Sequence, residues 1–81
     1  MYSEECYIVF PEGDMQEVPG RLHINQLVDI NGFPVPLPLS TNKTLVYRIS
    51  QITRKEHRGG CDIYHYLEQL SADELSEYVR F

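Results

Sequence analysis

TLVYRISQITR, residues 44–54, and CDIYHYLEQL, residues 61–70, are the two stretches that decide the fold of this chain. Apolar residues recur at every second position of the first stretch from Leu45 to Ile49, a period-two pattern typical of a half-buried β-strand. The polar sequence KEHRGG, residues 55–60, separates the two stretches and has the composition of a turn. The two stretches therefore predict a long β-hairpin.

Both strands of this hairpin depart from simple alternation. Ile52 breaks the alternation of the first strand, which predicts a β-bulge near Gln51. Both faces of the second strand carry apolar or aromatic side chains, with Ile63, His65 and Leu67 on one face and Tyr64 and Tyr66 on the other. The pattern therefore does not decide which of these faces points inward.

The beginning of the chain predicts a second, shorter hairpin. ECYIVF, residues 5–10, is rich in β-forming residues and stops at the turn sequence PEGD, residues 11–14. Residues 15–18 can return antiparallel to this strand before Pro19-Gly20 interrupts the chain.

Residues 21–30 predict one half-buried strand, because apolar and polar side chains mostly alternate along it, with a bend near Asn25. Asn31-Gly32 follows directly. Both central residues of a type I′ hairpin turn need a positive φ, and Asn-Gly is the pair that adopts it most readily. We therefore expect a tight turn here and a new strand that starts at Phe33.

The stretch FPVPLPL, residues 33–39, has an unusual period of two. Apolar Phe33, Val35, Leu37 and Leu39 alternate with Pro34, Pro36 and Pro38. The spacing differs from that of a PxxP ligand. Because alternate N–H groups of a strand point to the same edge, the three prolines remove donors from one edge only. The stretch predicts an edge strand that pairs on one side, and an irregular proline-rich loop is the alternative.

The end of the chain predicts a helix over residues 72–79. Ser71 is suited to cap the first turn, and Glu74, three residues later, completes the spacing of a capping box. Leu70 and Leu75 have the spacing of a hydrophobic staple across the start of this helix.

These elements add up to five or six short strands and one C-terminal helix within 81 residues. A chain of this length has room for a single domain, residues 1–81, with one core. Short strands and one small helix cannot cover a flat sheet, so the pattern predicts a mainly β fold, a small antiparallel barrel. By analogy at the level of fold alone, an SH3-like or related, partly open barrel fits the strand count.

The composition argues against several classes of protein. No apolar run approaches the ~20 residues of a membrane span, and MYSEE, residues 1–5, is acidic where a signal peptide is basic. We therefore expect a cytoplasmic protein without membrane contact. The net charge of −5 argues against broad affinity for nucleic acid.

Sequence motifs for catalysis, cofactors or metals are not visible. Cys6 and Cys61 lack the CxxC spacing of a zinc knuckle and are predicted to be buried core residues. A metal site formed by both cysteines with His23 and His65 is conceivable, but no spacing assembles it. The chain has no GxSxG elbow and no glycine-rich loop that opens a helix. We expect a protein that is not an enzyme and holds no metal or cofactor.

Charge is distributed unevenly along the chain, because residues 43–60 carry five basic residues and one acid while both flanking segments are acidic. This division favours a protein–protein binding or assembly module, whose partner is another protein or a second copy in a homodimer. The predicted partner-binding residues are two aromatic anchors, Tyr64 and Tyr66, and a cationic rim, Arg54, Lys55 and Arg58. In the alternative arrangement, the opposite charges face each other within one monomer.

A second functional hypothesis uses the same hairpin to bind nucleic acid. Small β-barrels hold single strands by stacking bases on tyrosines that lie beside phosphate-binding cations. The residues available for this role are Arg48, Arg54, Lys55, Arg58 and Tyr64.

Overall fold

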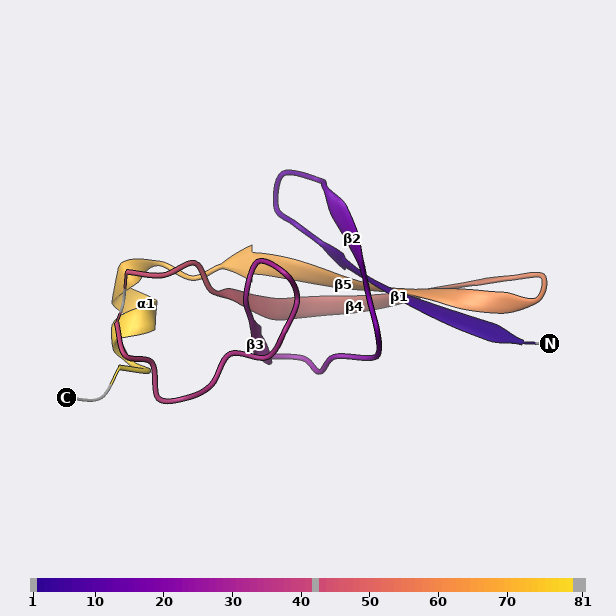
Figure 1. Cartoon of the computed structure of the whole chain (residues 1–81). Coiled ribbons are helices and arrows are strands. Elements are labelled where there is room, and N and C mark those ends of the chain that lie inside the picture. The colour runs from indigo at the N-terminus through magenta and orange to yellow at the C-terminus, as the bar shows by residue number, and fades with distance from the viewer. Residues whose placement is uncertain (1, 42, 80–81) are drawn as a thin grey trace.

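The computed structural model describes residues 2–41 and 43–79 of the chain. Its elements are β1 (Ser3–Val9), β2 (Met15–Val18), β3 (Leu27–Val28), β4 (Tyr47–His57), β5 (Gly60–Gln69) and α1 (Ala72–Ser76). The strands form one five-stranded sheet in the order β2-β1-β5-β4-β3 (Figure 1). The fold is mainly β, as predicted, and its sheet forms an open half-barrel with β2 and β3 as the two edges.

The long hairpin predicted from the sequence is confirmed as β4 and β5. The two strands pair antiparallel from Tyr47 opposite Gln69 to His57 opposite Gly60. The register shifts between Ile49 and Gln51, which confirms the predicted bulge. The turn is short because Gly59 adopts a φ of 91°.

The expectation of a purely antiparallel sheet is wrong, because β1 lies parallel to β5. Ser3 pairs with Gly60 at one end of this ladder and Val9 with Tyr66 at the other. The N-terminal hairpin of β1 and β2 is antiparallel, as predicted, so the sheet is mixed. Period-two alternation is the same for parallel and antiparallel neighbours, and the sequence pattern therefore carries no information on strand direction. A relationship to SH3-like barrels stays a prediction.

The sheet has one buried face, and β5 shows which one it is. Cys61, Ile63, His65 and Leu67 are buried, whereas Tyr64 and Asp62 are only half-buried and Tyr66 is exposed. The segment that follows β2 crosses this inner face, where the backbone N–H of Leu22 donates to Nε2 of His65. The main core cluster lies there and includes Cys6, Ile8, Val28, Tyr47, Ile49, Cys61 and Ile63.

The strand predicted over residues 21–30 is wrong except at Leu27–Val28. Asn25 has a φ of 68°, so the predicted bend is a change of direction that takes residues 21–24 off the strand path. The turn after Asp29 also differs from type I′, because Gly32 has a positive φ and Asn31 does not. Oδ1 of Asp29 accepts hydrogen bonds from the N–H groups of Asn31 and Phe33, which favours a longer, side-chain-stabilised turn.

The edge strand predicted over residues 33–39 is also wrong, and the irregular proline-rich alternative is the one observed. Val35 N–H donates to the carbonyl of Leu27 at 3.1 Å, and Leu39 N–H donates to the carbonyl of Tyr78 at 2.7 Å. The N–H donors thus belong to the residues that alternate with the prolines, as expected, but their acceptors lie in two different segments of the chain. The chain bends between them and forms no continuous ladder; the Leu37–Pro38 peptide is cis.

The predicted capping box is confirmed at the start of α1. Glu74 N–H donates to Oγ of Ser71 at 3.2 Å, and Ser71 N–H donates to Oε1 of Glu74 at 3.1 Å. Leu70 and Leu75 lie in one buried cluster, as the predicted staple requires. The helix ends at Ser76 rather than at residue 79, because Val79 forms an isolated bridge with Leu39. Across the described part of the chain, no helix is long and apolar enough to cross a bilayer.

The molecule is elongated because one end of the long hairpin extends past the rest of the fold (Figure 1). Its dimensions are 50 × 22 × 17 Å, and its radius of gyration is 14.1 Å, compared with about 12 Å for a compact chain of this length. We call the projecting end, residues 53–62 of β4, the turn and β5, the finger. The first residues of β1 lie alongside it.

Candidate functional site

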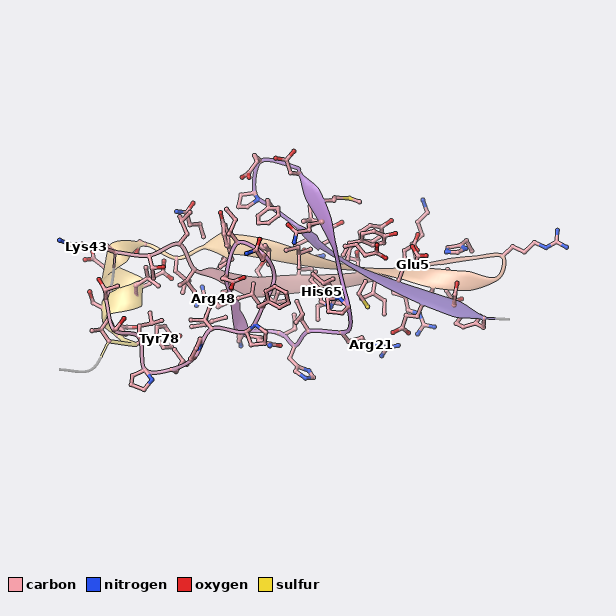
Figure 2. The ribbon with its side chains drawn as sticks, in the orientation of Figure 1. Glu5, Arg21, Lys43, Arg48, His65 and Tyr78 are labelled. Carbon is pink, nitrogen blue, oxygen red and sulfur yellow. The ribbon has the colours of Figure 1, made fainter. Side chains whose placement is uncertain are left out.

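The outer face of the sheet, opposite the core, carries no covering helix or strand among the described residues. Strand pairing arranges its side chains in three rows across β2, β1, β5 and β4. The first row is Glu5, Asp62 and Lys55; the second is Glu17, Tyr7, Tyr64 and Thr53; the third is Met15, Val9, Tyr66 and Gln51. Figure 2 shows Glu5 on this side of the sheet and Arg21 on the other.

The middle of the outer face is aromatic. The rings of Tyr7 and Tyr64 stack with centroids 5.5 Å apart and an interplanar angle of 20°. Tyr66 is 37 % exposed and Met15 is 53 % exposed. Because Tyr64 and Tyr66 lie on the central strand β5 and Met15 lies on the edge strand β2, these side chains form a partly apolar patch that extends from the middle of the sheet to one edge.

Acidic groups flank this patch on the β1 side. The hydroxyl of Tyr7 donates to Oε2 of Glu5 at 2.6 Å, and this bond with the nearby carboxylate raises the pKa of Tyr7 to about 12. Glu17 lies directly opposite Tyr7 on β2. The β1 half of the outer face is therefore negatively charged.

The β4 half of the same face is basic at the finger. Lys55 lies opposite Asp62, and it forms no ion pair with any described residue. Asp62 instead lies 3.3 Å from Nε2 of His57. The carbonyl of Arg58 and then Asp62 raise the pKa of His57, so protonation of the ring is favoured at this end of the sheet.

The five residues predicted to bind a partner do not share one surface. Tyr64, Tyr66 and Lys55 lie on the outer face, and Arg58 lies in the turn at the end of the finger. Arg54 points to the inner face, because neighbouring residues of a strand point to opposite sides. Its guanidinium lies 3.3 Å from the hydroxyl of Tyr2 and 3.0 Å from a carboxylate oxygen of Glu56.

Arg48, which the nucleic-acid hypothesis requires, has carboxylate partners. It pairs with Glu68 directly across the β4–β5 ladder and lies 3.6 Å from Glu74 of α1. Glu68 is the main cause of its raised pKa. Arg48 thus connects the sheet to the start of α1, and it lies at the opposite end of β4 from the finger.

A second feature lies on the inner face, where the segment after β2 crosses the sheet. A hollow of about 290 Å³ is lined by Arg21, Leu22, His23, Ile52, Arg54, Ile63 and His65. Arg21 makes two hydrogen bonds with the carboxylate of Glu4, one of them from Nε at 2.7 Å. This hollow is not predictable from the sequence pattern, which places residues 21–23 in a strand, whereas in the structure they lie across the sheet.

The described residues contain no group of three or more histidine, cysteine or acidic side chains placed to hold a metal ion. Cys6 and Cys61 are free and buried, and burial raises the pKa of the Cys6 thiol. Both ring nitrogens of His65 are engaged by backbone groups of Leu22 and Tyr7.

Comparison with known proteins identifies the family of the chain. A family model described as "Uncharacterised Treponema protein" matches residues 2–78, and the chain belongs to this family. No curated protein and no solved structure matches the chain.

Proposed function

We propose that this member of the Treponema family is a non-enzymatic assembly module whose outer sheet face binds the same face of a second copy. The observation that supports this proposal is the uncovered face of the central strand, with Tyr64 and Tyr66 in its middle. A sheet normally buries one face and exposes a polar one. Here the exposed face carries stacked tyrosines, Val9 and the largely exposed Met15.

The position of β5 favours a two-fold contact. It is the third of five strands, so an axis along β5 would place the β1 half of one sheet over the β4 half of the other. Tyr64 and Tyr66 would then contact their own counterparts in the partner. Two sheets packed face to face in this way lie about 10 Å apart and bury the aromatic side chains between them, as in a β-sandwich.

Charges in the first row agree with the same axis. Glu5 and Lys55 lie in one row on opposite sides of β5. The axis therefore brings Glu5 of each copy over Lys55 of the other, forming two symmetric ion pairs. Asp62, which lies close to the axis, has its own partner in His57. Complementary charges of this kind fix the register of an interface more than its strength.

Size and cysteine chemistry are consistent with the proposal. A domain of about 80 residues buries only roughly 60–65% of its unfolded surface, so association provides stability that its own core does not. Both cysteines are free, which suits a reducing compartment, and we place the module in the cytoplasm.

Light scattering on a size-exclusion column, at low salt and at ~0.5 M salt, tests the proposal. We expect twice the mass of one chain, with weaker association at high salt. Tyr66→Ser should raise the dimer Kd by about tenfold or more, because the residue is lost twice in each dimer. A monomer at both salt concentrations overturns the proposal, and nucleic acid co-eluting at low salt favours the competing hypothesis.

A charge exchange identifies the interface. Lys55→Glu should raise the dimer Kd, and adding Glu5→Lys to the same chain should restore it, because the two new charges again face each other across the axis. Arg58→Glu is the matched control, since it makes the same reversal at the end of the finger and off the outer face. The proposed two-fold contact would be excluded if Lys55→Glu and Arg58→Glu raised the dimer Kd equally, or if adding Glu5→Lys did not restore the Kd of Lys55→Glu.

A further inference from the structure

The outer edge of β4 is paired over less than half of its length. β3 covers Tyr47 and Arg48. Beside Ile49, Asn25 N–H donates to the carbonyl of Ile49 at 2.8 Å, and Ile49 N–H donates to the carbonyl of Gln26 at 3.0 Å. Beyond this point, residues 51–57 have β5 on one side and no backbone partner on the other among the described residues.

Asn25 is where the neighbouring chain leaves this edge. Its φ of 68° lies in the left-handed region, which reverses the path that residues 26–28 follow beside β4. Residues on the N-terminal side of Asn25 lie on the inner face instead, where Leu22 binds His65. The strand position beside residues 51–57 is therefore vacant as far as residues 2–41 and 43–79 are concerned.

The vacant position opens beside the inner-face hollow. Ile52 and Ile63 supply apolar side chains to the hollow, Leu22 forms part of its wall, and Arg21 and Arg54 carry charge at it. Alternate side chains of an extra strand beside β4 would point to this face. One of them, opposite Ile52, would lie next to the hollow, and the next on the same face would lie opposite Arg54.

We propose that this edge of β4 binds an extended, acidic peptide of another protein as an added strand, with one large apolar side chain in the hollow. Strand addition obtains affinity from main-chain hydrogen bonds and specificity from pockets for alternate side chains. The edge of β4 supplies the main-chain hydrogen bonds, and the hollow supplies a pocket for one side chain. The binding site lies at the edge of β4 and on the inner face, shares only the charge of Lys55 with the outer face, and does not depend on the proposed dimer.

Charge selects an acidic peptide as the occupant. Arg54, Lys55 and Arg58 lie along this edge and its turn with Glu56 as the single acid. A second copy is a poor occupant for the same edge. An antiparallel pair of two β4 strands centred on Arg54 or on Glu56 places like charges directly opposite each other, which is destabilising.

A synthetic probe tests the proposal. The probe is a labelled heptapeptide, Thr-Glu-Glu-Thr-Leu-Val-Thr, which in antiparallel register places its leucine opposite Ile52 and its two glutamates opposite Arg54 and Lys55. We expect saturable binding in fluorescence anisotropy. Arg54→Glu should weaken it by about tenfold or more, and Lys43→Glu, the same reversal in a loop away from the edge, should leave it unchanged. Absence of saturable binding up to about 1 mM peptide overturns the proposal.

Backbone methylation of the probe separates strand addition from simple charge attraction. N-methyl groups on the alternate amides that face β4 should abolish binding, whereas the same number on the outward amides should leave it within about threefold. Equal binding by the two methylated probes overturns the proposal even if both bind. Tyr66→Ser should bind the unmodified probe normally, so that failure of the dimer and failure of the peptide site give different results.

Discussion

Nδ1 of His65 lies 2.8 Å from the carbonyl oxygen of Tyr7, and this hydrogen bond joins the two parallel strands through a side chain. The backbone N–H of Leu22 donates to the other ring nitrogen at 3.1 Å. Because a backbone N–H can only donate, Nε2 accepts and Nδ1 carries the proton. One fully buried imidazole thus connects β1, β5 and the segment that crosses the inner face.

Replacement of this imidazole tests how much it stabilises the fold. His65→Leu introduces an apolar side chain of similar size and removes the partner of the Leu22 N–H and of the Tyr7 carbonyl. We expect the free energy of unfolding, measured with urea, to fall by roughly 2–4 kcal/mol, because buried polar groups left without a partner are costly. His65→Gln, which can still donate and accept, should lose less. Equal losses for the two variants would contradict the hydrogen-bonding role.

Tyr7 should ionise late in an alkaline titration. Its folded pKa of about 12 lies above the ordinary value of 10.0, so the fold favours the neutral phenol. This contribution to stability is complete below pH 10 and is lost as the pH rises from 10 to 12. Tyrosinate absorbance during an alkaline titration should show a step near pH 12 that is absent in Tyr7→Phe. Glu5→Gln should move that step toward pH 10, since the Glu5 carboxylate is the main cause.

Gly60 is expected to tolerate no side chain. A Cβ at this position would lie 2.1 Å from the carbonyl oxygen of Ser3, a backbone atom in the neighbouring strand. Gly60→Ala should therefore separate the start of β1 from β5 and lower the free energy of unfolding by more than about 2 kcal/mol. Gly20→Ala is the control, because a Cβ there meets no atom within 4 Å. A neutral Gly60→Ala would show that β1 does not pair at this end.

The capping box should contribute about 1 kcal/mol. Ser71→Ala removes the oxygen that accepts from Glu74 N–H and should lower the free energy of unfolding by roughly 0.5–2 kcal/mol, whereas Ser71→Gly should lower it by only about a few tenths of a kcal/mol.

The hydrogen bond from the backbone N–H of Ser71 is the main cause of the lowered pKa of Glu74. That contribution is present above the unfolded pKa and is lost as the pH falls through the folded value. Urea melts at pH 7 and pH 3 should show a smaller acid loss for Glu74→Gln.

The sequence predicted the elements that short-range rules determine. The β4–β5 hairpin, its bulge near Gln51 and the capping box at Ser71 each depend on residues close together in the chain. The alternation of side chains and the chemistry of caps are local signals of this kind. The elements that these local signals predict are confirmed, although the signals say nothing about how the elements pair with the rest of the fold.

Features that depend on distant segments were not accessible. The pairing of β1 with β5 joins residues nearly 60 positions apart, such as Ser3 and Gly60, and alternation alone does not indicate it. Asn25 leaves the strand path where the segment before it crosses to His65, a contact across 43 residues. The sequence does indicate one reason why the predicted binding residues do not share a surface. Arg54 and Lys55 are adjacent in a strand, so their side chains point to opposite faces of the sheet.

The parallel ladder between β1 and β5 also determines the order in which the molecule can form. β1 is synthesised well before its main partner β5, because paired residues such as Ser3 and Gly60 lie far apart in the chain, and the ladder closes the long loop between them. Contacts of such long sequence separation slow folding, because the entropy of loop closure is lost before the contacts form. Until β5 is complete, the N-terminal hairpin has no sheet to join. A nascent chain in which β5 has not yet been synthesised therefore keeps β1 as an open edge available to other chains.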